Sequence, residues 1–359
     1  MLDTALRVLL GVLGLLIVAA VLVDLFSQVV VPRPARGRWR ISRMLFRMSW
    51  RSWRWLALRW DAATREDMLG IYAPAAVIVL LTVWVVLLGV GYGLVMWSLR
   101  EQTHPALTSY WQALFYAAAS TIGYGEVVPT TGLARAVVLA AAATGVGTVA
   151  LVISMLFSLY SAFQRRESLV ITLDASAGAP PSGIVLLETV RKHKMPQLLD
   201  RTFDDFRLWS AEVLESHLAY PTLIWFRSNH DNESWISALG AVMDAATIVL
   251  TTLEGEPKGP ASLMAKVGGH LVEDLVQVIQ VRHDHRVGIE RFEFDEACAR
   301  LEKVGYRVRP ADQAWTDFQA RRSEYAGSLS AFANMLVIPP APWMGDRSYL
   351  PHALRQSHD

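Results

Sequence analysis

The sequence of 359 residues contains one cysteine, Cys298. A disulfide within the chain needs two cysteines, and a metal site built on several thiolates also needs more than one, so both are excluded. The net charge of +1 gives no indication of nucleic-acid binding, and we expect no such partner. Acidic residues are absent from one long stretch, in which nine arginines lie between Arg33 and Arg59.

Hydrophobic residues make up 53% of the chain, and the mean hydropathy is +0.28. They are concentrated in three runs, residues 5–31, 71–98 and 132–163, and each exceeds the about 20 apolar residues that a helix needs to cross a bilayer. The first run is longer than the roughly 7–15 apolar residues of a secretory signal and has no clear cleavage signature, so we interpret it as a retained helix. The second half of the chain is normally charged.

Between the last two runs lies a short amphipathic segment, followed by Thr121-Ile122-Gly123-Tyr124-Gly125-Glu126. A potassium-selective pore replaces the hydration shell of the ion with rings of backbone carbonyls from several identical strands. Gly123 and Gly125 suit such a strand because glycine adopts positive φ without steric cost. We therefore expect the carbonyls of residues 121–125 and the Thr121 hydroxyl to bind K⁺, with the Tyr124 ring bracing the strand and Glu126 at the filter mouth.

This motif resembles the selectivity filter of the potassium channel pore-domain family, usually written T-V-G-Y-G followed by Asp. Ile122 replaces the valine and Glu126 replaces the aspartate, and neither change removes a carbonyl. Some members carry a glutamate four residues before the threonine, where this chain has Ala117, which puts the inactivation behaviour of the filter in doubt. The resemblance implies a homotetramer, K⁺ as the permeant ion, and passive conduction without catalytic residues.

The arginine-rich loop determines the expected orientation. Lys and Arg are enriched in short cytoplasmic loops, so residues 33–60 are expected inside, with the N-terminus outside and the C-terminus cytoplasmic. The protein is then a multi-pass protein of the cell membrane, with the filter at the outer face.

Six arginines at intervals of three and four share one face of a helix. We call them the arginine stripe: Arg36, Arg40, Arg43, Arg47, Arg51 and Arg54. Five tryptophans lie nearby in sequence, and a basic helix with tryptophans is typical of a segment that lies on anionic lipid. A topology determinant with no role in gating is an equally good interpretation. A voltage sensor is a third, but its arginines belong inside a spanning helix, which the serines of this segment disfavour.

Two further residues in the apolar runs are candidates for function. Gly145 lies where the inner helices of the family carry a gating hinge, although close packing against residues 71–98 explains a glycine there as well. Asp24 lies near the cytoplasmic end of the first run, where we expect it to reach the interface or to pair with an arginine.

The second half of the chain predicts a helical domain. Residues 173–183 include Ala-Gly-Ala-Pro-Pro-Ser-Gly, which indicates a linker. Amphipathic stretches follow at 184–194, 196–219, 233–253, 262–281, 294–305 and 310–336. They contain no G-x-G-x-x-G sequence after a strand, so no nucleotide-binding regulator is indicated. His283, Asp284 and His285, with His270, are a weak candidate for a divalent metal site, and we expect no metal other than K⁺.

We therefore predict an all-α membrane protein with three transmembrane helices, a re-entrant pore helix with its filter, and a C-terminal cytoplasmic helical domain. The expected parts are a transmembrane helix (1–32), a basic interfacial linker helix (33–70), the pore module (71–164), a linker (165–183) and the cytoplasmic domain (184–359). The predicted function is a potassium-selective channel. The alternative is a membrane-anchored sensor or scaffold with a degenerate or weakly selective pore, and the stimulus and any regulatory ligand stay open.

Overall fold

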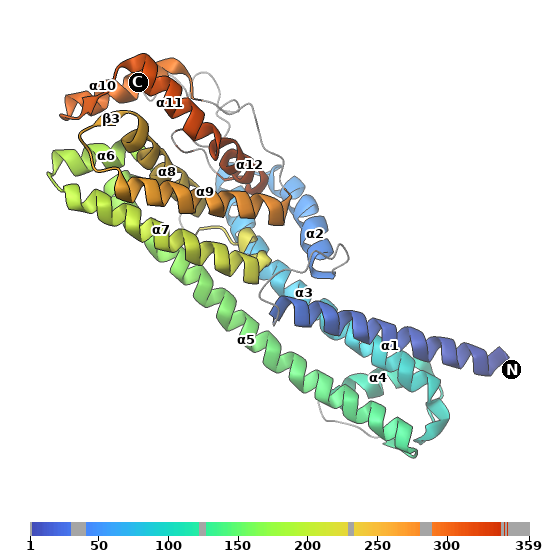
Figure 1. The fold of residues 1–359 in the computed structure, drawn as a ribbon. Coiled ribbons are helices and arrows are strands. Elements are labelled where there is room, and N and C mark those ends of the chain that lie inside the picture. Colours follow the sequence, from blue (N-terminus) through green and yellow to red (C-terminus); the bar gives the residue numbers. More distant parts are fainter. Residues whose placement is uncertain are drawn as a thin grey trace. The chain divides into compact units, whose positions relative to one another are not determined.

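The computed structural model describes residues 2–29, 41–121, 127–228, 233–280 and 289–338, together with Ala341 and Trp343. The chain divides into two compact units, Met1–Tyr160 and Ser161–Asp359. Helices dominate both units, and each unit has one pair of two-residue strands among the described residues (Figure 1).

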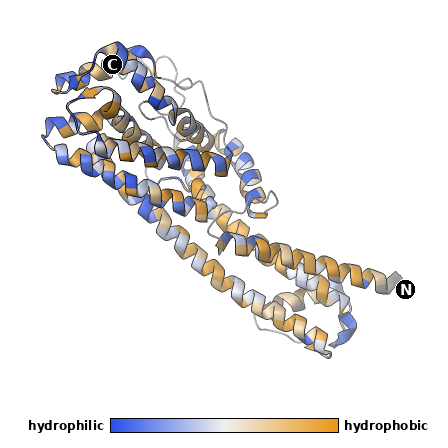
Figure 2. Cartoon of the chain, in the orientation of Figure 1, coloured by the Kyte–Doolittle hydropathy of each residue, from blue (hydrophilic) through white to orange (hydrophobic). Residues whose placement is uncertain are grey.

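The first unit is an all-α membrane unit. Its elements are α1 (Leu2–Val29), α2 (Ile41–Ala57), α3 (Ala62–Ser98), the 3₁₀ helix η1 (Arg100–Gln102), β1 (Thr103–His104), α4 (Tyr110–Thr121), β2 (Val128–Pro129) and the first part of α5 (Gly132–Ala177). Three segments are long and apolar enough to cross a membrane, at Ala5–Val29, Ala63–Ser98 and Gly132–Ala177. Figure 2 shows the hydrophobic residues along α1 and α3, whereas the helices of the second unit carry both kinds of residue.

Glycines allow α1 and α3 to pack closely. A Cβ at Gly14 would lie 2.5 Å from the carbonyl oxygen of Gly91, and a Cβ at Gly91 would lie 2.7 Å from a methyl of Val18. Small residues at such crossings let helix backbones approach, which is a common way for membrane helices to associate. The first apolar run is therefore packed along α3.

Helix α5 corrects one sequence prediction. The expected linker at 165–183 is wrong for its first part, because α5 continues unbroken to Ala177. Residues 165–176 contain no glycine or proline, and Val170, Leu173 and Ala177 are buried in the core of the second unit. The break is confined to residues 178–182, where Gly178 has a φ of +80° and two prolines follow.

The second unit confirms a helical region. It contains α6 (Gly183–Lys192), α7 (Pro196–Ala219), η2 (Pro221–Trp225), α8 (Trp235–Thr251), β3 (Leu253–Glu254), α9 (Gly259–Ile279), α10 (Arg291–Lys303), β4 (Arg307–Val308), α11 (Ala311–Ser323) and α12 (Ala326–Leu336). The stretch expected as one helix at 310–336 is two helices, which separate at Glu324 and Tyr325.

Helix α8 is the centre of this unit, because all of its residues except Leu250 are buried. Helices α6, α7, α9, α11 and α12 contact it, and α7 lies beside α9 (Figure 1). A helix that is apolar on all sides is expected in the middle of a bundle rather than at its surface. The large side chains Phe203, Phe206 and Trp209 of α7 and Trp235 of α8 form part of the core.

Glycine at the start of α6 allows this helix to meet α8, which gives a test of the core. A Cβ at Gly183 would lie 2.5 Å from the Ala241 carbonyl oxygen and 2.8 Å from the Ala245 nitrogen, both backbone atoms of α8. We expect Gly183→Ala to lower the free energy of unfolding by about 1–3 kcal/mol, measured by thermal unfolding of the solubilised protein. Gly259→Ala at the start of α9 is the control, because a Cβ placed there would have nothing within 4 Å. Equal stability of the two variants would contradict this packing.

Candidate ion pore and its connections

Helix α4 occupies the place expected of the pore helix, and it ends at Thr121. Residues Ile122 to Glu126, and the side chain of Thr121, lie outside the described residues. The predicted K⁺ ligands Ile122, Gly123, Tyr124 and Gly125, and Glu126 at the predicted mouth, are therefore placed by sequence alone. The structure describes the segments on either side of them.

Two short strands pair with each other on either side of α4 and the predicted filter. Strand β1 precedes α4 and pairs antiparallel with β2, which follows residue 126. Thr103 lies opposite Pro129, and His104 lies opposite Val128. The Thr130 amide also donates to the Gln102 carbonyl (2.9 Å). After the predicted filter, the chain thus returns beside the segment that precedes α4, as a re-entrant loop requires.

The pore helix packs against α3 through a glycine. A Cβ at Gly93 would lie 3.1 Å from the Cα of Leu114, so the two helices are in close contact there. Ala113, Tyr116 and Ala117 are buried. On another face of α4, Trp111 and Phe115 are 75% and 65% exposed. These two rings are one turn apart and leave an aromatic face of α4 uncovered by this chain.

The membrane part of α5 has a narrow buried seam. Five of its buried positions recur every seven residues, at Ala134, Ala141, Thr148, Met155 and Ala162, and Leu159 is buried between the last two. A seven-residue interval keeps side chains on nearly the same line along a helix. On other faces large apolar side chains are exposed, namely Leu139, Val146, Val149, Ile153, Phe157 and Tyr160. Most of the surface of α5 is therefore available to lipid or to other copies of the chain.

Gly145 lies within α5 and does not interrupt the helix. Beside it, the Thr144 hydroxyl lies 2.7 Å from the Tyr92 hydroxyl of α3, and Tyr92 also donates to the Ala140 carbonyl (3.3 Å). This contact joins α3 and α5 at the level of the glycine. Nothing lies within 4 Å of a Cβ built at nearby Gly147, so close packing does not explain that second glycine.

Asp24 is buried, and its partners differ from those expected. Its carboxylate accepts hydrogen bonds from the Ser42 amide (3.1 Å), the Ser42 hydroxyl (3.0 Å) and the Trp84 indole (2.9 Å). Gln28 donates to the same hydroxyl (2.6 Å). Among the described residues no arginine pairs with Asp24, and the carboxylate joins α1 to the first turn of α2 and to α3.

The arginine stripe is described only in part. Arg36 and Arg40 lie outside the described residues, whereas Arg43, Arg47, Arg51 and Arg54 lie on α2. Arg47 and Arg51 are exposed, and Arg43 and Arg54 are partly buried. Helix α2 contains no acidic residue, so it presents a purely cationic set of charges.

A buried arginine anchors α5 within the second unit. The Arg166 side chain is 1% exposed and pairs with Glu167 (2.8 Å). It also donates to the carbonyls of Leu223 (3.2 Å) and Phe226 (2.7 Å), which belong to η2 and the residue after it. The Trp209 indole donates to the Arg166 carbonyl (2.9 Å). The local sequence pattern around Arg166 does not reveal that this side chain is buried.

His217 of α7 completes this arrangement. Its ring lies 3.3 Å from the Arg166 guanidinium and 2.8 Å from the Val213 carbonyl. Burial, with a further contribution from the Arg166 charge, lowers the pKa of His217 from 6.5 to about 3. A neutral ring can donate to the Val213 carbonyl through Nδ1 and accept from Arg166 through Nε2, which satisfies both nitrogens.

A second buried ion pair stabilises the opposite side of the domain. Asp244 of α8 accepts hydrogen bonds from Arg322 (2.9 Å) and from the Tyr325 hydroxyl (2.6 Å). Tyr325 also contacts the Thr247 hydroxyl (3.1 Å). Burial raises the pKa of Tyr325 well above its usual value, so the phenol remains a donor.

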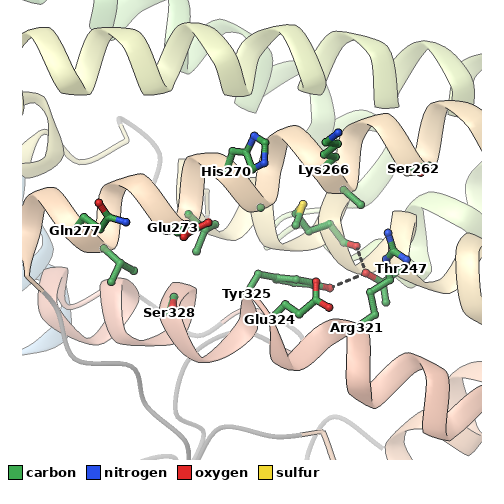
Figure 3. A pocket seen from close by; sticks show the side chains of 15 residues that line it. Thr247, Ser262, Lys266, His270, Glu273, Gln277, Arg321, Glu324, Tyr325 and Ser328 are labelled. Carbon is green, nitrogen blue, oxygen red and sulfur yellow. Dashed lines mark hydrogen bonds between the residues drawn. The ribbon is translucent and has the colours of Figure 1, made fainter. Parts of the chain in front are cut away.

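Tyr325 also lines an open groove of about 610 Å³ between α9 and the α11–α12 pair. In Figure 3 the labelled side chains come from both helical edges, and the dashed contact joins Tyr325 to Thr247. The groove carries charges of both signs, from Lys266, Glu273, Arg321 and Glu324, and His270 also lines it. Over the described ranges no three His, Cys, Asp or Glu side chains form a metal-binding group. His283, Asp284 and His285 lie outside those ranges.

Comparison with known proteins identifies a family for the segment that contains α4. A family model described as "Ion channel" matches residues 76–162, which contain most of α3, all of α4 and the membrane part of α5. This segment is an ion channel pore domain. The uncharacterized membrane protein YdjJ of Bacillus subtilis (strain 168) is 23% identical over 245 residues, which is 65% of this chain and 69% of that protein. No solved structure matches the chain significantly.

The match makes the protein an ion channel located in a membrane, and it points to transport rather than catalysis. It ends at residue 162, just before the Arg166 anchor, so the second unit of the channel lies outside the matched family. Helix α5 belongs to both parts: it enters the pore domain at Gly132 and reaches Ala177 in the second unit.

Loss of the Arg166 guanidinium is expected to destabilise the second unit of the channel. In Arg166→Gln, the Glu167 carboxylate and two buried carbonyls lose their donor, which costs about 3–5 kcal/mol of unfolding free energy. Arg166→Lys keeps the charge but not the planar set of donors, so its loss should be intermediate. Thermal unfolding followed by near-UV circular dichroism measures this order. A glutamine variant as stable as the wild type would contradict the anchor.

The neutral state of His217 predicts a specific pH dependence. The folded-state pKa of about 3 is below the unfolded value of 6.5, so the unfolded chain binds more protons between these values. Stability is therefore complete above pH 6.5 and is lost as the pH falls. We expect this residue alone to remove about 2 kcal/mol of unfolding free energy between pH 7 and pH 5. His217→Gln should show a correspondingly shallower decline in parallel denaturation curves, and identical slopes would refute the assignment.

Proposed function

We propose that this protein is a potassium-selective channel that conducts passively as a homotetramer. The observation that carries the proposal is the sequence Thr121 to Gly125, which begins at the last residue of α4 inside the ion channel pore domain. Its glycines permit the carbonyl-lined strand that dehydrated K⁺ requires. The pairing of β1 with β2 supports a loop that enters and leaves on the same side of α4.

The exposed surfaces of the first unit support a symmetric assembly. A single chain supplies one filter strand, whereas rings of carbonyls require several strands around an axis. Trp111 and Phe115 of α4 and the apolar side chains of α5 are uncovered within one chain. Packing of these surfaces between copies would enclose the pore, with four copies implied by the family resemblance.

The proposed orientation has the N-terminus outside and the C-terminus in the cytoplasm. The argument is the excess of arginine between the first two spans, which is expected on the cytoplasmic side. Arg165 and Arg166, which follow the pore domain, then lie on the same side. The second unit becomes a cytoplasmic domain that assembles or regulates the gate.

The link between gate and domain is α5 itself. Its backbone is helical from the pore domain to Ala177. The Arg166 guanidinium donates to carbonyls of Leu223 and Phe226, and the Arg166 carbonyl accepts from Trp209 of α7. A rearrangement of the second unit that displaces these carbonyls would therefore act on the pore-lining helix. Gly145 is the candidate hinge at which such a displacement would bend α5.

Potassium flux into liposomes that contain the purified channel tests the proposal. We expect barium-sensitive K⁺ flux that exceeds Na⁺ flux at least tenfold, and its loss in Gly123→Asp and Tyr124→Ala, because both changes disturb the carbonyl strand. Gly70→Asp is the matched control, since nothing lies within 4 Å of a Cβ built there.

Two other results of this flux measurement would contradict the proposed function. Equal K⁺ and Na⁺ flux would contradict potassium selectivity and favour a weakly selective pore. No flux from well-folded oligomers would contradict conduction and favour a membrane-anchored sensor or scaffold.

A further inference from the structure

Helix α2 carries two adjacent exposed stripes. At about 100° per residue, Arg43, Arg47, Arg51 and Arg54 fall within about 80° of one another around the helix. Next to them, Met44, Met48 and Trp55 fall within about 40°. These three apolar side chains are about 60% exposed. The sequence pattern identified the arginines, whereas the exposed apolar stripe beside them becomes evident only in the structure.

The opposite face of α2 is occupied by its own unit. Ser42, Phe46 and Trp50 are buried, and the last two rings pack against Tyr72 of α3, with centroids 6.4 and 4.8 Å apart. The Trp53 indole donates to the Met68 carbonyl (2.8 Å). These contacts hold α2 in one rotation, so the two stripes face away from α1 and α3.

The start of α2 lies near one end of the first span. Arg7 and Glu101 form an ion pair (2.7 Å) at one end of the α1–α3 pair. Asp24, bonded to Ser42 and to Trp84 in the middle of α3, lies in the last turns of α1. Arg7 and Asp24 are separated by a helical rise of about 26 Å, close to the about 30 Å of a bilayer core. Ser42 and the start of α2 therefore lie near the end of the first span that is opposite to Arg7.

The charges of α2 favour an anionic occupant. Arg47 and Arg51 are exposed and make no ion pair with any residue that the structure describes, and the helix has no acid of its own. At the end of the helix, the Arg59 guanidinium stacks on the Trp55 ring, 3.4 Å from its centroid. A phosphate beside acyl chains matches a cationic stripe beside an apolar one, whereas a soluble acidic protein would not use the membrane boundary.

We propose that α2 binds anionic phospholipid, with Arg47 and Arg51 at the phosphate and Met44, Met48 and Trp55 against the acyl chains. Such a site ties the linker between the first two spans to the composition of the surrounding leaflet. It does not depend on the ion that the pore conducts. A failure of the flux experiment and a failure of this one can therefore be told apart.

Native mass spectrometry of the full chain in mild detergent tests the site. The protein is incubated with equimolar phosphatidylglycerol and phosphatidylcholine, and retained lipid is counted. We expect the wild type to retain phosphatidylglycerol preferentially. Arg47→Gln/Arg51→Gln should weaken this preference about 30-fold, because each arginine near an anionic surface contributes about a fivefold factor. Met44→Ser/Met48→Ser should lower the retention of both lipids.

The control variant Arg201→Gln/Lys266→Gln removes two charges of the second unit and should retain lipid like the wild type. An unchanged preference in the α2 double variant would overturn the proposal, and so would an equal loss in the control. Glycerophosphoglycerol, the headgroup without acyl chains, is not expected to displace the lipid. Efficient displacement by it would overturn the lipid assignment in favour of a soluble phosphate ligand.

Discussion

A charge that leaves water must have its hydration replaced by neighbouring groups, and this constraint determines where several helices of this protein meet. Asp24 receives three hydrogen bonds from α2 and α3, although it lies on an apolar spanning helix. Arg166 has a carboxylate and two carbonyls around its guanidinium. Asp244 is partnered by an arginine and a tyrosine from the α11–α12 region. In each case at least one partner comes from another element, so the charge helps to define how those elements are placed.

The apolar contacts elsewhere are less specific, and glycine supplies the close approaches. Gly14 and Gly91 let α1 pack on α3, Gly93 admits Leu114 of the pore helix, and Gly183 lets α6 meet α8. Lipid chains are as apolar as leucine, so membrane helices associate through such close packing and through polar contacts rather than through the hydrophobic effect. The position of α4 is therefore determined by close packing against α3, whereas hydrogen bonds to the Asp24 carboxylate position the first turn of α2.

Helix α5 runs through both units of the chain. Its membrane part belongs to the ion channel pore domain, and its continuation is anchored in a second unit that the family match does not include. Apolar faces of this helix and of α4 are exposed within one chain. The mixed charges of the groove between α9 and α12 are a different kind of surface, which water can solvate without a partner.

Much of the architecture was predictable from residue patterns. The three spans, the pore helix and most helices of the second unit follow from apolar length and from periodicity, and α7 has the predicted bounds. The predicted linker began at residue 165, although α5 continues to Ala177. A segment rich in proline and glycine indicates a break, but it does not show at which residue the preceding helix ends. The predicted filter residues Ile122 to Glu126 lie outside the described residues, so their assignment stays a prediction from the sequence.

The sequence by itself determined the order of spans, the filter motif and the cationic character of α2, because each depends on residues close together in the chain. Only the tertiary structure decided which charges are buried and what partners them. Asp24 and Trp84 are 60 residues apart, and Arg166 and Phe226 are also 60 apart. No local pattern encodes such pairs, since a buried arginine and a solvated one have the same neighbours in sequence and differ only in what the fold brings beside them.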